Sequence, residues 1–189
     1  MQITINDAKE TFTLIDTPGF VDSPDDNLDI LEDIAETLAR LQQEVFGAIY
    51  FHNITEKRMK GTAIAVLDAF KAMCGKEFYP HMAFVTTMWD TVHKRVHLNL
   101  NVTHEELRNG PMRLRNSVGV YQRLANDDQF AKDLLNRFWL LARDRPAPPT
   151  LHLVKELGPG ARTVVSTSAG RRLLKDDRTK PSDGCCAVM

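Results

Sequence analysis

Hydrophobic and polar positions alternate in two short stretches at the start of the chain. The stretches Met1–Ile5 and Thr11–Ile15 flank a turn-forming run, Asn6–Lys9. Alternation with a period of two is typical of β-strands, and a polar break of this length is typical of a hairpin. The pattern therefore predicts a β-hairpin over residues 1–15.

Two continuous apolar runs follow, and a helical pattern precedes each of them. The runs are Val45–Phe51 and Met82–Thr87, and they are typical of strands covered on both faces. Before the first run, Ser23-Pro24 combines a hydroxyl cap with a proline at the first helical position. Between the runs, apolar residues recur at helical spacing from Ala63 to Phe70. Strands that alternate with helices predict an α/β fold with a doubly wound, mostly parallel sheet.

The rest of the chain has a more helical pattern. Apolar residues mark a helix over Phe130–Leu141, a short segment over Leu151–Leu157 and a last helix that begins near Ser168. From Lys175 onward the composition is that of a disordered tail. The predicted organisation is a main domain over residues 1–143, a C-terminal helical extension over 144–174 and a tail over 175–189.

The composition is that of an ordinary globular protein. Hydrophobic residues make up 43% and charged residues 26% of the chain, and the formal net charge is -1. This balance argues against nucleic acid as the main partner. No apolar run approaches the roughly 20 residues of a membrane span, and three cysteines are too few for a disulfide framework. A cytoplasmic location is therefore expected.

The first candidate binding motif is Asp16-Thr17-Pro18-Gly19, which follows the strand expected to end at Ile15. An aspartate at the carboxyl end of a parallel strand can hold Mg²⁺ directly or through water. A glycine three residues later allows the backbone to approach a phosphate. The same four residues also form a good turn sequence, and this alternative stays open.

The second candidate motif is Thr86-Thr87-Met88-Trp89-Asp90, which begins in the last two residues of the second apolar run. A carboxylate at this edge of a parallel sheet can accept hydrogen bonds from N1 and N2 of guanine, which adenine does not offer, so Asp90 is the predicted base-recognition residue. Met88 is expected to pack its thioether against the base. Trp89 is either a core residue or a base contact.

Three segments in this order resemble the fungal G-domain proteins related to the AIG1-like and septin-like GTPases: LIDTPGF, GAIYFHNITEKRMKG and AFVTTMWD. The resemblance implies a fold of the P-loop GTPase type, GTP or GDP bound with Mg²⁺, and a homodimer through the G domain. It places Asp16, with Mg²⁺, Thr17 and Gly19 near the phosphates. It places Thr87, Met88 and Asp90 near the base.

The resemblance also covers the segment Tyr50–Gly61. In the family this segment lies between the third and fourth guanine motifs. It implies that His52 and Arg58 belong to a loop near the nucleotide or at a dimer face, with an ordinary surface loop as the alternative.

The phosphate-binding part of such a domain is not found in the sequence. No G-x-x-x-x-G-K-[ST] motif occurs in the chain, so the first strand of the sheet and its P-loop are expected to be absent. The absent strand would separate the strand ending at Ile15 from Val45–Phe51. Those two strands should therefore either pair directly or leave apolar side chains and backbone groups unpaired.

Catalysis is also doubtful by this comparison, because Phe20 stands where small GTPases carry a glutamine that orients the attacking water. The prediction is a truncated or degenerate GTPase with weak nucleotide binding and little or no hydrolysis. The alternative is a pseudo-GTPase that acts as a protein-interaction module and reaches membranes through a lipid.

Two further motifs lie toward the C-terminus. Ser166–Ala169 is similar to the fifth guanine motif, but a helix cap is the favoured interpretation. The last four residues, Cys186–Met189, match C-a-a-X with a terminal methionine that favours farnesyl. Cys185 is a candidate for palmitate as a second lipid. Lipidation at these cysteines predicts peripheral contact with a membrane.

Overall fold

A computed structural model describes residues 2–4, 11–20, 23–41, 45–56, 61–91, 97–114, 120–123, 128–144, 147–158 and 163–175. Cys185, Cys186 and Arg58 lie outside these residues, and the lipidation of the two cysteines stays a prediction. The elements in chain order are β1 (Gln2–Thr4), β2 (Thr11–Thr13), α1 (Pro24–Leu41), β3 (Ala48–Asn53), α2 (Gly61–Cys74), a 3₁₀ helix (Lys76–His81), β4 (Met82–Thr87), α3 (His97–Asn109), β5 (Val120–Arg123), α4 (Asp128–Asp144), α5 (His152–Glu156), a further 3₁₀ helix (Val164–Ser166) and α6 (Ser168–Lys175).

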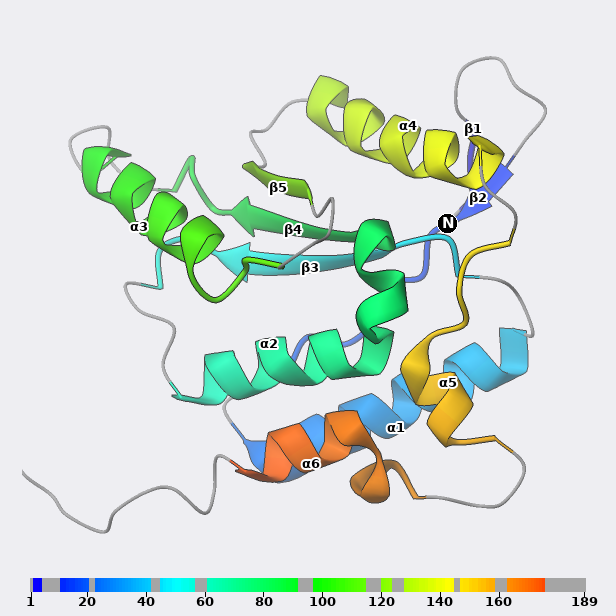
Figure 1. Cartoon of the computed structure of the whole chain (residues 1–189). Coiled ribbons are helices and arrows are strands. Elements are labelled where there is room, and N and C mark those ends of the chain that lie inside the picture. Colours follow the sequence, from blue (N-terminus) through cyan, green and yellow to red (C-terminus); the bar gives the residue numbers. More distant parts are fainter. Residues whose placement is uncertain are drawn as a thin grey trace, which may run out of the picture.

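The main sheet has three parallel strands in the order β3-β4-β5. Its register aligns Ala48 with Met82 and Asn53 with Thr87, while Ala83 lies opposite Val120. The strand predicted over Met82–Thr87 is confirmed to the residue. The fold is therefore mixed α/β with mostly helical content and a small parallel sheet, as Figure 1 shows.

The central strand β4 is buried on both faces. Met82 and Phe84 point into the larger core cluster with residues of α2, whereas Ala83 and Val85 form a second cluster with Leu134 and Phe138 of α4. In Figure 1 these two helices lie on opposite sides of the sheet. Because both faces of β4 are buried, its sequence is a continuous apolar run and does not alternate between apolar and polar residues.

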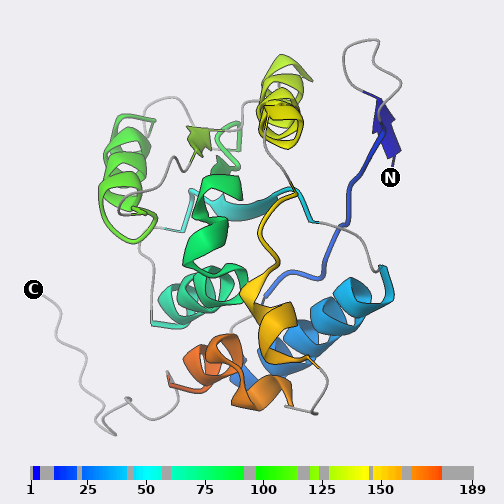
Figure 2. The same ribbon diagram turned by 45° about the vertical axis from the view of Figure 1, so that its right-hand side comes forward.

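A second helical layer lies beyond α2. Figures 1 and 2 show α1 and α6 side by side beneath this helix. Leu31 of α1, Leu67 of α2, Leu153 of α5 and Leu173 of α6 all belong to the larger core cluster. The helical segment 144–174 thus shares its hydrophobic core with the rest of the chain.

The predicted hydroxyl cap of α1 is present, and α2 is followed by a glycine. Asp26 N–H donates to Ser23 Oγ at 3.4 Å, which makes Ser23 the cap of α1. Gly75 follows the last residue of α2 with a φ of 81°, a conformation that glycine adopts without steric cost. The helix predicted over Phe130–Leu141 is confirmed as the longer α4.

The predicted hairpin is confirmed, but its expected link to the parallel sheet is wrong. β2 pairs antiparallel with β1, with Ile3 opposite Phe12, and this pair forms a sheet separate from β3-β4-β5. Figure 2 shows the hairpin standing apart from the main sheet. The physical reason is that a pattern of alternating residues identifies a strand but not its partner, because pairing depends on contacts between segments far apart in the chain.

The separation of the hairpin leaves β3 at the edge of the main sheet. Of the two outcomes expected for an absent first strand, direct pairing of β2 with β3 does not occur in the described part of the chain. Phe51 of β3 is instead 56% exposed, and Ile15 after β2 is 43% exposed. Each of these two segments thus has a large apolar side chain in contact with water.

Candidate functional site

The carboxyl ends of β3 and β4 lie side by side. Asn53 and Thr87, the last residues of the two strands, are register partners. Just beyond them, Ile54 N–H donates to the carbonyl oxygen of Thr87 at 3.2 Å. The segments that follow both strands therefore leave the sheet at one common edge, which is where open parallel sheets bind ligands.

The segment after β4 is a tight turn around Met88. Met88 has a φ of 63° and a side chain that is 48% exposed. Positive φ costs a non-glycine residue about 1–3 kcal/mol and persists only where the surrounding structure determines it. Thr91 Oγ1 donates to the carbonyl oxygen of Met88 at 2.8 Å and so closes the turn.

Trp89 is a core residue, which decides between the two interpretations that its sequence position allowed. Its side chain is only 3% exposed, and the indole Nε1–H donates to Thr86 Oγ1 at 3.0 Å. The ring also contacts His104 of α3 edge to face, with centroids 5.7 Å apart. The next residue, Asp90, is exposed. The buried tryptophan thus anchors a turn whose flanking residues face the solvent.

The segment after β3 is fixed by its own side chains. Asn53 Oδ1 accepts hydrogen bonds from Thr55 N–H at 3.0 Å and from Thr55 Oγ1 at 2.8 Å. This arrangement is an Asx turn, in which a side chain replaces a backbone acceptor. Both segments at the sheet edge therefore have defined local conformations.

His52 does not lie in a loop, and that part of the expectation is wrong. It belongs to β3, is 4% exposed and faces the same side of the sheet as its register partner Thr86. The strand β3 extends two residues beyond the apolar run, to Asn53, and so includes this histidine. Within the described residues its Nε2 has no hydrogen-bond partner. Burial lowers the pKa of His52, and the carboxylate of Glu56 opposes the shift.

This lowered pKa predicts that acid destabilises the fold through His52. The folded state disfavours the protonated imidazole, so the contribution of His52 is complete above the unfolded pKa of about 6.5 and is lost as the pH falls below it. Urea unfolding at pH 7.5 and at pH 5.5 should show a smaller acid-induced loss for His52→Leu than for the wild type. An equal loss in both proteins would contradict the assignment.

Asp16 stands in a different setting from the one that its motif predicts. β2 ends at Thr13, and residues 14–20 have no regular structure, so Asp16 does not follow a parallel strand. Asp16, Thr17 and Gly19 are all exposed. A β-carbon built on Gly19 would meet no atom within 4 Å. Phosphate or Mg²⁺ binding by these residues stays a prediction.

The described residues contain no ready-made group of metal ligands. Among them, no three His, Cys, Asp or Glu side chains lie close enough together to hold a metal ion. Protein sites for Mg²⁺ commonly supply only one or two carboxylates and leave the other positions to water and phosphate. Asp16 therefore fits such a role only together with a nucleotide.

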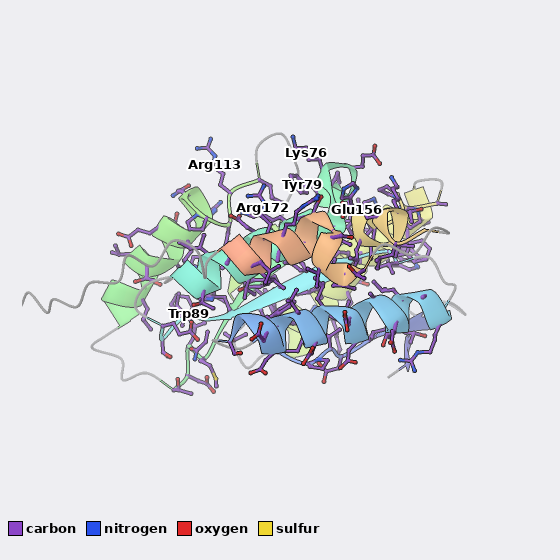
Figure 3. All side chains as sticks on the ribbon, turned by 90° about the horizontal axis from the view of Figure 1, so that it is seen from below. Lys76, Tyr79, Trp89, Arg113, Glu156 and Arg172 are labelled. Carbon is purple, nitrogen blue, oxygen red and sulfur yellow. The ribbon has the colours of Figure 1, made fainter. Side chains whose placement is uncertain are left out.

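Ser166–Ala169 forms a helix cap, as the favoured interpretation predicts. Gly170 N–H donates to Thr167 Oγ1 at 3.1 Å at the start of α6. Glu156 accepts hydrogen bonds from both the N–H of Ser168, at 2.9 Å, and its Oγ, at 2.8 Å. In Figure 3, Glu156 and Trp89 lie well apart, on different sides of the view. This segment is thus remote from the turn that carries Asp90.

A shallow hollow of about 470 Å³ lies elsewhere, on the outer face of α3. Its lining residues are Asn101, Val102, Glu105, Glu106 and Asn109. None of the predicted site residues lines it. Sequence reasoning did not single out His104 on the same helix, because no helix was predicted there.

Comparisons with protein families, with curated proteins and with solved structures found no match for this chain. Within the described residues, no helix has both the length and the apolar character that crossing a membrane requires.

Proposed function

We propose that this chain binds the base of a guanine nucleotide at the carboxyl ends of β3 and β4, with Asp90 as the base-recognition residue. The observation that supports the proposal is the geometry of the turn after β4. Asp90 is exposed directly beyond a buried parallel strand, next to a tryptophan that anchors the turn from below. Ligand sites of open parallel sheets occupy this position.

The chemistry of the exposed residues agrees with a purine base. An ionised carboxylate is an acceptor only, so it pairs with the N1–H and N2–H groups of guanine and not with the bare N1 of adenine. Met88, 48% exposed beside Asp90, offers a flexible thioether that can pack against the face of a ring. The two residues together supply base selectivity and an apolar contact.

Affinity is expected to be weak and hydrolysis slow. The sequence contains no P-loop motif, which normally provides backbone N–H groups and a lysine for the phosphates. Phe20, at the position of the catalytic glutamine of small GTPases, is partly buried against the main core cluster. A carbon side chain in contact with the core cannot orient a water molecule. Titration calorimetry giving a micromolar Kd for GTP would contradict the expected weak binding.

The decisive test replaces Asp90 with asparagine and compares labelled guanine, adenine and xanthine nucleotides. The wild type should prefer guanine. Asp90→Asn should lose about 10- to 100-fold of its affinity for guanine, because a hydrogen bond to a charged group contributes about 1.5–3 kcal/mol. The variant should gain affinity for xanthine, because the amide adds an N–H donor opposite the O2 of this base.

The matched control is Asp29→Asn, which changes an exposed carboxylate on α1. It should leave all three affinities unchanged. Equal binding of guanine and adenine nucleotides by the wild type, or an unchanged preference in Asp90→Asn, would refute the proposal.

A further inference from the structure

The turn that carries Asp90 is joined to α3 by two consecutive hydrogen bonds, the first buried and the second partly buried. Trp89 Nε1–H donates to Thr86 Oγ1 at 3.0 Å, and the same oxygen lies 3.2 Å from Nδ1 of His104. Thr86 is 1% exposed and Trp89 is 3% exposed. The chain therefore connects three parts of the fold, which are β4, the turn after it and α3.

The direction of these hydrogen bonds follows from the chemistry of the three groups. An indole N–H is a donor only, so Thr86 Oγ1 accepts from Trp89. The hydroxyl hydrogen of Thr86 is then available to Nδ1 of His104, which accepts it when the imidazole is neutral and carries its proton on Nε2. The chain thus runs from Trp89 through Thr86 to His104, with each group in a role that it can fill.

We infer that Thr86, Trp89 and His104 are positioning residues that hold Asp90 in place for the base, an inference that rests on the proposed function. Trp89 lies between Met88 and Asp90 in the chain. Because its indole is held inside by Thr86, the backbone must turn its two neighbours outward, and Met88 takes up its left-handed conformation. A strained conformation persists only where the surroundings determine it. The buried hydrogen bonds provide that constraint.

Removal of the Thr86 hydroxyl distinguishes a role in hydrogen bonding from a role in packing alone. Thr86→Val keeps a β-branched side chain of similar size and leaves the indole N–H of Trp89 without its acceptor. Thr86→Ser keeps the hydroxyl and loses one methyl group. We expect Thr86→Val to raise the Kd for the guanine nucleotide about 10-fold and to lower the ratio of guanine to adenine affinity, because a buried donor loses the hydroxyl that accepts its hydrogen bond. Thr86→Ser should keep both within about 3-fold, because its hydroxyl can still accept from the indole N–H.

Two spectroscopic measurements test the hydrogen-bond chain without nucleotide. The protein has two tryptophans, so two indole N–H signals are expected, and Trp89→Phe identifies one of them by its loss. Thr86→Val should shift the Trp89 signal and speed hydrogen exchange of the Met88 and Asp90 amides. Thr86→Ser should do neither. Circular dichroism should show that all variants are folded.

The outcomes separate the inference from the proposed function. If Thr86→Val changes neither the indole signal nor the amide exchange, the positioning role is refuted, whatever the wild type binds. If the turn loosens but the base ratio does not change, the role is refuted as well. If the wild type shows no guanine preference, the proposed function fails, and amide exchange alone then decides whether the chain holds the turn.

Discussion

Replacement of Phe84 with alanine is expected to destabilise the protein by about 3–5 kcal/mol, the range typical of large-to-small changes at buried aromatic residues. Phe84 is 1% exposed in the central strand. Its ring centroid lies 6.0 Å from that of Phe70 and 6.2 Å from that of Tyr50. Alanine removes these contacts and leaves a cavity that the sheet and α2 cannot close without moving. Such a loss is a large part of the roughly 5–15 kcal/mol that small domains possess.

The matched control is Phe51→Ala on the neighbouring strand. Phe51 carries the same side chain in the same kind of element, but it is 56% exposed. Its replacement should cost less than about 1 kcal/mol, because little area leaves contact with the protein. Urea unfolding followed by circular dichroism measures both. Equal losses for the two variants would mean that the core does not lie where β4 and α2 meet.

Replacement of Gly170 with alanine is the second change with a large expected effect. A β-carbon at this position would lie 2.3 Å from the carbonyl oxygen of Val164 and 3.0 Å from the Cα of Val165. Both are backbone atoms, so no side-chain rotation can relieve the overlap. Overpacking of this kind costs about 1–3 kcal/mol or more. In a helix with free space around the residue, the same change stabilises by up to about 1 kcal/mol. The sign of the change in stability therefore tells whether backbone atoms lie against residue 170.

The structural consequence should appear in α6. This helix packs against α2 and α1, and it must move away from the 3₁₀ helix Val164–Ser166 if residue 170 gains a β-carbon. Gly19→Ala is the control, since nothing lies within 4 Å of its β-carbon. Thermal unfolding should lower Tm for Gly170→Ala and leave Gly19→Ala near the wild type. A stabilised Gly170→Ala would contradict the close approach of α6 to its preceding turn.

Among the described strands, β3 lies at the edge of the main sheet, next to the proposed binding site. An edge strand presents unpaired backbone groups, and proteins usually shorten, charge or cover such edges. Here Phe51 remains more than half exposed on the strand that leads to the candidate site. The hydrogen bonds that support the proposed base site come from β4 and α3, through Thr86, Trp89 and His104.

Most of the helices and both apolar strands were predictable because their signals are local. Ser23 and Pro24 mark the start of α1, and the run Met82–Thr87 defines β4 to the residue. The strand β5 and the helix α3 were not predicted. α3 begins with His97, has few apolar residues and a weak periodicity. Such elements are stabilised mainly by contacts with distant parts of the chain, which a local pattern does not contain.

In the candidate site, too, the local features were predictable from the sequence and the contacts with distant segments were not. The motif Thr87–Asp90 identified Asp90 beyond a buried strand, and the structure confirms that strand and the exposure of the residue. The motif did not reveal that Trp89 is buried, because a tryptophan after a strand suits a core as well as a binding surface. It also did not reveal His104, which reaches Thr86 from a helix that is separate in the sequence.

Residue order alone determined the local units of this protein, namely the hairpin, the helix caps, the apolar strand β4 and an acidic residue beyond it. Each of these depends on neighbours within a few positions, through hydrogen bonds and side-chain periodicity that the order of residues specifies directly. Folding in three dimensions decided which strands share a sheet, which face His52 and Trp89 occupy, and how α3 meets the turn after β4. Those outcomes depend on contacts between segments far apart in the chain, where burial and hydrogen-bond geometry select one pairing among several that the pattern allows.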